Sequence, residues 1–162
     1  MPKSPLADLP EVFVSNAAIT SAVSRAVAIG SLRQIGSKLY TSNLVDAPEA
    51  IVRRYLWPLV AAYLPGALIV DRTAIESRPA ADGSIFVVAD RKRDIELPGM
   101  TIRSRDGVGP LETDRPFVGG LFLSSTARAW LDNMAPSRRR NGEISRTLTR
   151  EELELLYSRA VA

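Results

Sequence analysis

Apolar residues recur every three or four positions between residues 19 and 27, which is the spacing of one face of a helix. The stripe consists of Ile19, Ala22, Val23, Ala26 and Val27. Ser15 and Asn16 precede it and can cap the start of a helix, since their side chains accept hydrogen bonds from the first backbone amides. Gly30 follows, and glycine readily takes the left-handed conformation that ends many helices. The pattern therefore predicts an amphipathic helix that stops at Gly30.

The apolar spacing changes after Gly30, where two short apolar runs flank Gly36 and Ser37. Two such runs around a glycine-containing turn predict a β-hairpin. A helix, a glycine and then a short hairpin is the order of a winged helix, in which the helix enters the major groove and the hairpin touches phosphates. Only residues 6–14 precede the helix, so the predicted element is a minimal one. The predicted DNA contacts are Thr20, Ser21, Ser24 and Arg25 on the helix and Arg33 and Lys38 on the hairpin.

The remaining pattern alternates between short helices and short strands. Asp46 and Glu49 are spaced to begin a helix that runs to Tyr63, and Pro58 is expected to kink or split it. Residues 71–76 form a short helix, 84–89 a strand buried on both faces, and 95–97 and 100–105 a hairpin joined by a Pro-Gly turn. Residues 119–123 form a strand, Ser124 is expected to cap the next helix, and a capping box at Thr149 and Glu152 opens the last one.

These elements predict an α+β fold, with a minimal winged helix packed on a core of short helices and a small, mostly antiparallel sheet. We divide the chain into three parts: residues 1–45, an arm and the winged-helix-like element; 46–136, the α/β core; and 137–162, a basic linker and a C-terminal helix. The chain of 162 residues is 46% apolar, which is enough to build a core without disulfides or a structural metal.

Composition narrows the possible chemistry. The chain has no cysteine and no histidine, which removes thiolate zinc sites, cysteine nucleophiles and the commonest general base. Asp71, Glu76, Asp90, Asp94 and Glu96 could hold a divalent metal, as carboxylates do in nucleases. A nuclease site also has a lysine soon after its second carboxylate, whereas Glu96 is followed by leucine and proline. We therefore expect no enzyme activity, no metal and no cofactor.

The net charge is +3, and only three of the 21 cationic residues are lysines. Arginine binds phosphate with two parallel hydrogen bonds, so clustered arginines suit nucleic acid. A possible second basic patch consists of Arg91, Lys92, Arg93, Arg103 and Arg105. The alternative interpretation, which we favour for this patch, is a solvated hairpin end partly neutralised by its neighbouring carboxylates. No signal-peptide core or membrane-length apolar run is present in the sequence, so we expect a cytoplasmic protein with no membrane partner.

Three passages resemble AbiEi-type antitoxins of type IV toxin–antitoxin systems. Residues 25–41 are similar to the helix, Gly, Leu-Arg-x-Ile, Gly, x-Tyr passage that closes the winged helix of this family. Residues 65–76 resemble its Gly-Ala-Val-Ile-Ser-His-x-Ser-Ala-Leu segment, although Asp71 stands where a histidine is often found. Residues 120–132 resemble its late strand-then-helix passage. Together the three passages span from the predicted recognition helix to the last core helix.

The resemblance implies a DNA-binding transcriptional regulator that represses its own operon, with double-stranded operator DNA and a cognate toxin as partners. Similar modules look to occur ahead of Fic-type catalytic domains, which leaves open a protein-interaction module that docks a toxin or a fused catalytic domain. Such a module would expose an apolar patch, for which Trp57 with Tyr63, or Trp130, are the candidates.

Overall fold

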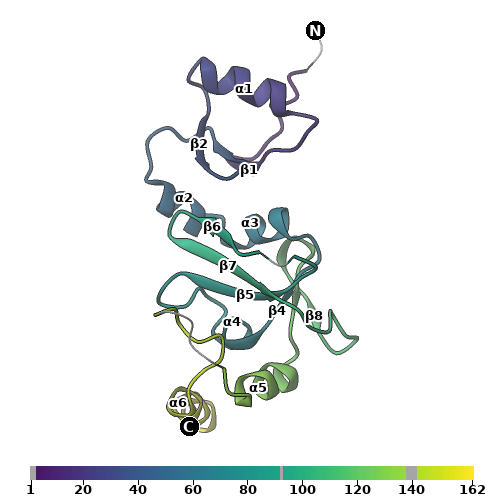
Figure 1. The fold of residues 1–162 in the computed structure, drawn as a ribbon, viewed down its shortest axis with the longest axis vertical. Helices are drawn as coiled ribbons and strands as arrows, with labels where there is room; N and C mark the ends of the chain where they lie inside the picture. Colours follow the sequence, from purple (N-terminus) through teal and green to yellow (C-terminus); the bar gives the residue numbers. More distant parts are fainter. Residues whose placement is uncertain (1–2, 92, 138–141) are drawn as a thin grey trace.

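The computed structural model describes residues 3–91, 93–137 and 142–162, and it confirms the α+β class with two β-sheets and short helices around them. The molecule is elongated (Figure 1), with helix α1 (Thr20–Ala28) near one end and helices α5 (Thr126–Met134) and α6 (Arg150–Val161) at the opposite end. The larger sheet lies between these two ends. Any functional surface on α1 is therefore separated from any on α5 and α6.

The N-terminal unit is a three-stranded antiparallel sheet crossed by one helix. Its strands are β1 (Val12–Val14), β2 (Arg33–Gly36) and β3 (Leu39–Thr41), in the order β1-β3-β2. Helix α1 connects β1 to β2, and Gly30 has the predicted left-handed conformation with φ of 78°. The hairpin is confirmed, but its turn lies at residues 37 and 38, one position later than predicted. The segment before α1 contributes a strand that the sequence pattern did not predict.

Two consecutive helices, α2 (Pro48–Arg54) and α3 (Leu56–Tyr63), replace the single long helix, which confirms the predicted split near Pro58. They bury Ile51, Val52, Leu59 and Val60 almost completely. Asp46 does not cap α2 as predicted, because Ala47 is the capping residue and no side chain caps it. Within the described residues, no helix is long and apolar enough to cross a membrane.

The larger sheet has six strands in the order β6-β7-β5-β4-β9-β8. The strands are β4 (Leu68–Ile69), β5 (Ser84–Val88), β6 (Ile95–Leu97), β7 (Met100–Arg105), β8 (Arg115–Pro116) and β9 (Phe122–Leu123). The β5–β7 and β4–β9 pairs are parallel and the other three pairs are antiparallel. All five residues of β5 are buried, and β6 and β7 form the predicted hairpin.

Each face of this sheet has its own apolar cluster, because successive side chains of a strand point to opposite faces. One face packs against α2 and α3, and the same cluster includes Val12 and Leu39 of the N-terminal sheet. The N-terminal unit is therefore packed on the core through shared apolar contacts. The second face carries a smaller cluster, against which Ile144 of the C-terminal segment packs; its buried members are Leu68, Val70, Phe86 and Val88.

Helix α4 (Asp71–Glu76) and α5 lie beyond this second face, and a short 3-10 turn, η1 (Val118–Gly120), precedes β9. The predicted cap of α5 is wrong by one residue. Ser125 caps it, accepting a hydrogen bond from the Arg128 amide at 3.3 Å, while the Ser124 hydroxyl donates to the Ile69 carbonyl at 2.9 Å. The capping box of α6 is confirmed, since both the Thr149 and the Glu152 side chains make their expected bonds.

Candidate functional site

The polar face of α1 is open to solvent. Val23 and Ala26 lie on the buried face of the helix, with 2% and 7% of their surfaces exposed. The four residues on the other face are all exposed, as a DNA-reading helix requires; they are Thr20, Ser21, Ser24 and Arg25. The predicted base-reading residues are therefore brought together on one accessible helix face.

Arg33 has a different role from the predicted phosphate contact. Its side chain is half-buried, its Nε donates to the Asn43 carbonyl at 2.8 Å, and its Nη2 donates to the Asp46 carbonyl. Its guanidinium thus holds the segment after β3 in place. We correct the sequence prediction by removing Arg33 from the candidate interface, because its side chain is half-buried and two of its guanidinium nitrogens donate to carbonyls of the chain.

Arg33 belongs to a polar seam that joins the N-terminal sheet to α2. Asn43 donates to Glu11 at 2.7 Å and to Asp46 at 2.9 Å, and the Tyr55 hydroxyl donates to Glu11. Arg54 pairs with Asp46 at 2.9 Å. Hydrogen bonds from Tyr55 and Asn43 hold the pKa of Glu11 below its ordinary value, so its carboxylate remains charged at neutral pH. Together with the shared apolar cluster, this seam fixes how the N-terminal unit is attached.

The hairpin turn does not project into solvent as the wing of a winged helix would. The Tyr63 hydroxyl of α3 donates to the Ser37 carbonyl at 2.6 Å, and the Ser15 amide donates to the Lys38 carbonyl at 2.7 Å. Burial raises the pKa of Tyr63 to about 12, so this hydroxyl keeps its proton. The turn is docked against α3 through its backbone, while Ser37 and Lys38 are themselves exposed.

Beside this turn lies a hollow of about 580 Å³ that brings two predicted sites together. Lys38 of the hairpin, Arg91 of the second basic patch and Tyr63 of α3 all line it. Asp94 and Glu96 line the same hollow, so its charge is balanced. The sequence placed Lys38 and Arg91 in separate patches, because the contact between hairpin and core depends on the tertiary fold.

The second basic patch is divided in the structure. Arg91 and Arg93 are exposed, and Lys92 lies outside the described residues. Arg103 pairs with Asp94 at 2.9 Å and with Glu143 at 3.3 Å. The possible second basic patch is therefore not one open surface. Arg103 and Arg105 point to the covered face of the sheet, where carboxylates neutralise them, and the Arg103–Asp94 pair agrees with the favoured interpretation of a partly neutralised hairpin end.

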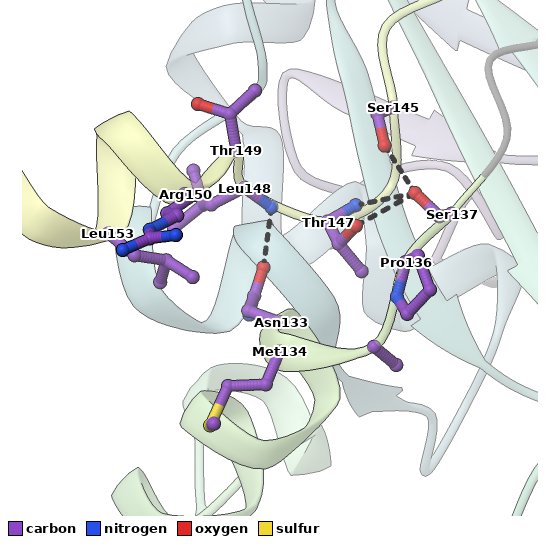
Figure 2. A pocket seen from close by; sticks show the side chains of 11 residues that line it. Asn133, Met134, Pro136, Ser137, Ser145, Thr147, Leu148, Thr149, Arg150 and Leu153 are labelled. Carbon is purple, nitrogen blue, oxygen red and sulfur yellow. Dashed lines mark hydrogen bonds between the residues drawn. The ribbon is translucent and has the colours of Figure 1, made fainter.

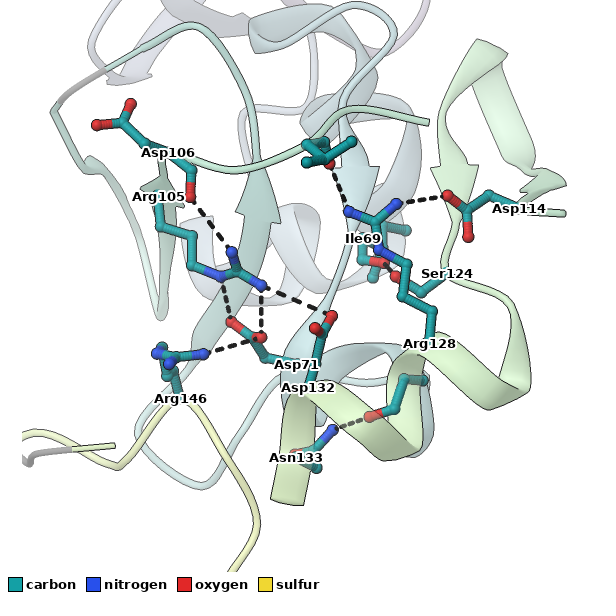
Figure 3. Close-up of polar contacts among 12 residues, drawn as sticks. Ile69, Asp71, Arg105, Asp106, Asp114, Ser124, Arg128, Asp132, Asn133 and Arg146 are labelled. Atoms are coloured by element: carbon teal, nitrogen blue, oxygen red, sulfur yellow. Dashed lines mark hydrogen bonds and ion pairs between the residues drawn. The ribbon is translucent and has the colours of Figure 1, made fainter. Parts of the chain in front are cut away.

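Arg105 takes part in a buried ion-pair network centred on Asp71 (Figure 3). The Asp71 side chain is fully buried, accepts two hydrogen bonds from Arg105 at 2.9 Å each, and accepts a third from Arg146 at 3.1 Å. Its φ of 56° is left-handed, a conformation in which aspartate and asparagine are enriched. Burial and the charge of Asp71 raise the pKa of Asp132, which lies 3.6 Å from Arg105.

Polar contacts also attach the C-terminal segment to the core. The Arg72 amide donates to the Arg146 carbonyl at 3.0 Å, and the Arg72 guanidinium pairs with Glu152 of α6 at 3.2 Å. The Leu148 amide donates to the Asn133 side chain at 2.9 Å, next to hydrogen bonds among hydroxyl side chains (Figure 2). Ion pairs and hydrogen bonds therefore hold residues 142–149 against the core, together with the burial of Leu148.

A second buried carboxylate, Asp114, fixes the loop before β8. It accepts hydrogen bonds from the Leu111 amide at 2.9 Å, the Ser125 amide at 2.8 Å and Arg128 at 2.7 Å. Burial acts to raise the pKa of Asp114, but these hydrogen bonds outweigh it and hold the pKa below its ordinary value. The Asp114–Arg128 ion pair anchors the loop to α5, and its role is structural.

Trp57 and Tyr63 do not form the predicted exposed apolar patch. Trp130 is not exposed either, but exposed apolar residues lie beside it on α5. Trp57 packs edge-on against Phe117, with ring centroids 5.2 Å apart, and is half-buried. Trp130 is half-buried too, but its neighbours Leu131 and Met134 are 67% and 70% exposed. A groove of about 600 Å³ separates the end of α5 from the start of α6 (Figure 2). Sequence reasoning named Trp130 but not the exposed Leu131 and Met134 beside it, because their exposure depends on the tertiary fold.

Among the described residues, no group of three or more acidic side chains is placed to hold a metal ion. Comparison with protein-family models, curated proteins and solved structures found no significant match to the chain.

Proposed function

We propose that this chain is a DNA-binding transcriptional regulator whose recognition helix is α1. The observation that carries the proposal is the open polar face of α1 above a sheet with the order β1-β3-β2, which is the strand order of a winged helix. Nine helical residues with their apolar side packed and their polar side exposed suit a major groove. The resemblance to AbiEi-type antitoxins supports a non-catalytic regulator that represses its own operon.

Arg25 is the main phosphate contact in this proposal, because it is exposed and cationic on the recognition helix. Lys38 and Arg91 are exposed cations too, but Asp94 and Glu96 line the same hollow and weaken their attraction for phosphate. The docked hairpin and the short segment before α1 limit the contact area. Affinity should therefore depend strongly on ionic strength, since each neutralised phosphate releases a counterion.

The test is binding of the 162-residue chain to the DNA upstream of its own gene, followed by fluorescence anisotropy at several salt concentrations. Arg25→Ala should weaken binding by about tenfold and reduce the slope of log affinity against log salt by about one. Arg53→Ala is the matched control, because Arg53 is an exposed helical arginine of α2 that belongs to neither proposed surface. No binding at low salt, or equal losses in both variants, would contradict the proposal.

A second candidate function is protein docking to a toxin or a fused catalytic domain, and the exposed apolar residues of α5 and α6 favour it. Leu131, Met134 and Tyr157 are each at least 65% exposed. This surface lies at the end opposite α1, so DNA binding and docking do not compete for the same residues. Capture of a defined toxin that is lost with Leu131→Glu, without any DNA affinity, would favour this candidate over the first.

A further inference from the structure

Helix α6 has an apolar stripe that its own chain covers only in part, since Leu153 and Leu156 are half-buried and Tyr157 is exposed. Its twelve residues include none that are buried, although Leu153, Leu156, Tyr157 and Ala160 share one face at helical spacing. Tyr157 and the neighbouring Val161 are 65% and 68% exposed. The capping box and the Arg150–Glu154 pair at 2.8 Å support the helix, but a helix of this length is marginal in water without tertiary packing.

The exposed residues of α5 extend this surface. Leu131 and Met134 lie three residues apart on the outer side of α5, and both are mostly exposed. Met134 and Leu153 line the groove between the two helices, as Figure 2 shows. We define the α5–α6 surface by the apolar residues on these two helices and in the groove between them: Leu131, Met134, Leu153, Leu156, Tyr157 and Val161. Met134 and Leu153 meet at the groove, Leu153 and Leu156 are half-buried, and the other four are exposed.

We propose that a second copy of this chain covers the α5–α6 surface, with the two α6 helices packed antiparallel and the α5 helices beside them. The charges along α6 support this occupant. At 100° per residue, Glu152 and Arg159 lie on the same edge of the apolar stripe, one heptad apart. An antiparallel pair with its two-fold axis between residues 155 and 156 places Glu152 of each copy opposite Arg159 of the other.

This arrangement is self-complementary, as a two-fold interface requires. It forms two equivalent ion pairs beside an apolar seam, and the helix dipoles oppose each other favourably. The Glu152 side chain is 42% exposed although it contacts Arg72, so it can still accept from a second arginine. The inference is independent of DNA binding, because the α5–α6 surface lies at the end opposite α1.

The experiment measures the mass of the full 162-residue chain by sedimentation equilibrium over roughly 1 to 200 μM, where associations of micromolar affinity are resolved. The wild type should form a dimer in a concentration-dependent manner. Tyr157→Glu should raise the dissociation constant at least about tenfold, because it places a charge at the centre of the apolar seam. Leu155→Glu is the matched control: Leu155 is 54% exposed on the same helix but points away from the stripe.

Arg159→Glu tests the register separately. It replaces two exposed ion pairs with like charges and should weaken the dimer by about three- to tenfold. Far-UV circular dichroism confirms that each variant retains its helices, and Val161→Glu replaces Tyr157→Glu if that variant does not fold. A chain that stays monomeric at all concentrations overturns the proposal. So does a dimer that is equally sensitive to Leu155→Glu and Tyr157→Glu, and a dimer insensitive to Arg159→Glu overturns the antiparallel register.

Discussion

The buried carboxylate of Asp71 organises the second face of the sheet, and Asp71→Asn tests this directly. Asparagine has the same shape and tolerates the left-handed backbone at φ 56°, so the substitution removes the charge with little backbone strain. It leaves Arg105 and Arg146 without their shared anion, while the remaining amide oxygen can still accept a hydrogen bond. The measured loss therefore reports on the ion pairs.

The expected magnitude follows from the exposure of the two arginines. Removing one partner of a fully buried ion pair costs about 3 to 5 kcal/mol. The Arg105 and Arg146 side chains are 31% and 34% exposed, so solvent screens the unpaired cations and we expect a loss of about 2 kcal/mol. For a chain of this length, that loss corresponds to a decrease in Tm of about 4 to 8 °C.

Urea unfolding at pH 7 measures the change in free energy, and amide hydrogen exchange locates it. Exchange should accelerate at the Arg72 amide, which donates to the Arg146 carbonyl, and in residues 142–149. Asp90→Asn is the control, because Asp90 is exposed, and its effect should stay within about 0.5 kcal/mol. An Asp71→Asn protein as stable as this control, with unchanged exchange in the C-terminal segment, would refute the structural role of the network.

Two further predictions concern pH. Tyr63→Phe should cost about 1 kcal/mol at pH 7, through loss of the hydrogen bond to the Ser37 carbonyl. Burial raises the pKa of Tyr63 to about 12, so the stabilisation by its protonated hydroxyl is complete below about pH 10 and is lost between about pH 10 and 12. The difference in unfolding free energy between wild type and Tyr63→Phe, measured with urea, should therefore shrink over that range. A constant difference would contradict the assignment. Asp114→Ala should cost about 3 kcal/mol at pH 7, because it leaves two amides and Arg128 without an acceptor. The pKa of Asp114 is lowered in the folded state, so its contribution to stability is present above the unfolded pKa of about 4 and is lost as the pH falls through the folded pKa. Unfolding midpoints of wild type and Asp114→Ala that stay equally far apart at pH 7 and pH 2 would count against this prediction.

Local signals account for the features that the sequence predicted correctly. Gly30 marks the end of α1, the dense β-branched run gives the buried strand β5, and the Thr149 capping box starts α6, each within a few residues of its determinants. The open face of α1 follows from the same kind of signal, because helical spacing alone separates its apolar and polar sides.

Tertiary contacts account for the errors. Arg105 meets Asp71 across 34 residues, and Arg33 reaches carbonyls 10 and 13 residues away, so no local window distinguishes these structural arginines from free cations. The α5–α6 surface was missed for the opposite reason. Leu153 and Leu156 have the spacing of a core-facing helix, and only the structure reveals that the chain covers them in part and leaves Tyr157 and Val161 exposed.

The positions of the two proposed surfaces constrain how they could act together. The polar seam at Glu11 and the shared apolar cluster around Val12 and Leu39 fix the N-terminal unit to the core, so α1 cannot swing independently of the C-terminal helices. Classical helix-turn-helix dimers place two recognition helices about one DNA turn apart, roughly 34 Å. A dimer formed through α6 would instead hold its two α1 helices at the far ends of an elongated particle. If both proposals hold, the dimer joins two separate DNA segments. The wild-type chain should then bring two labelled duplexes together, and Tyr157→Glu should abolish this effect.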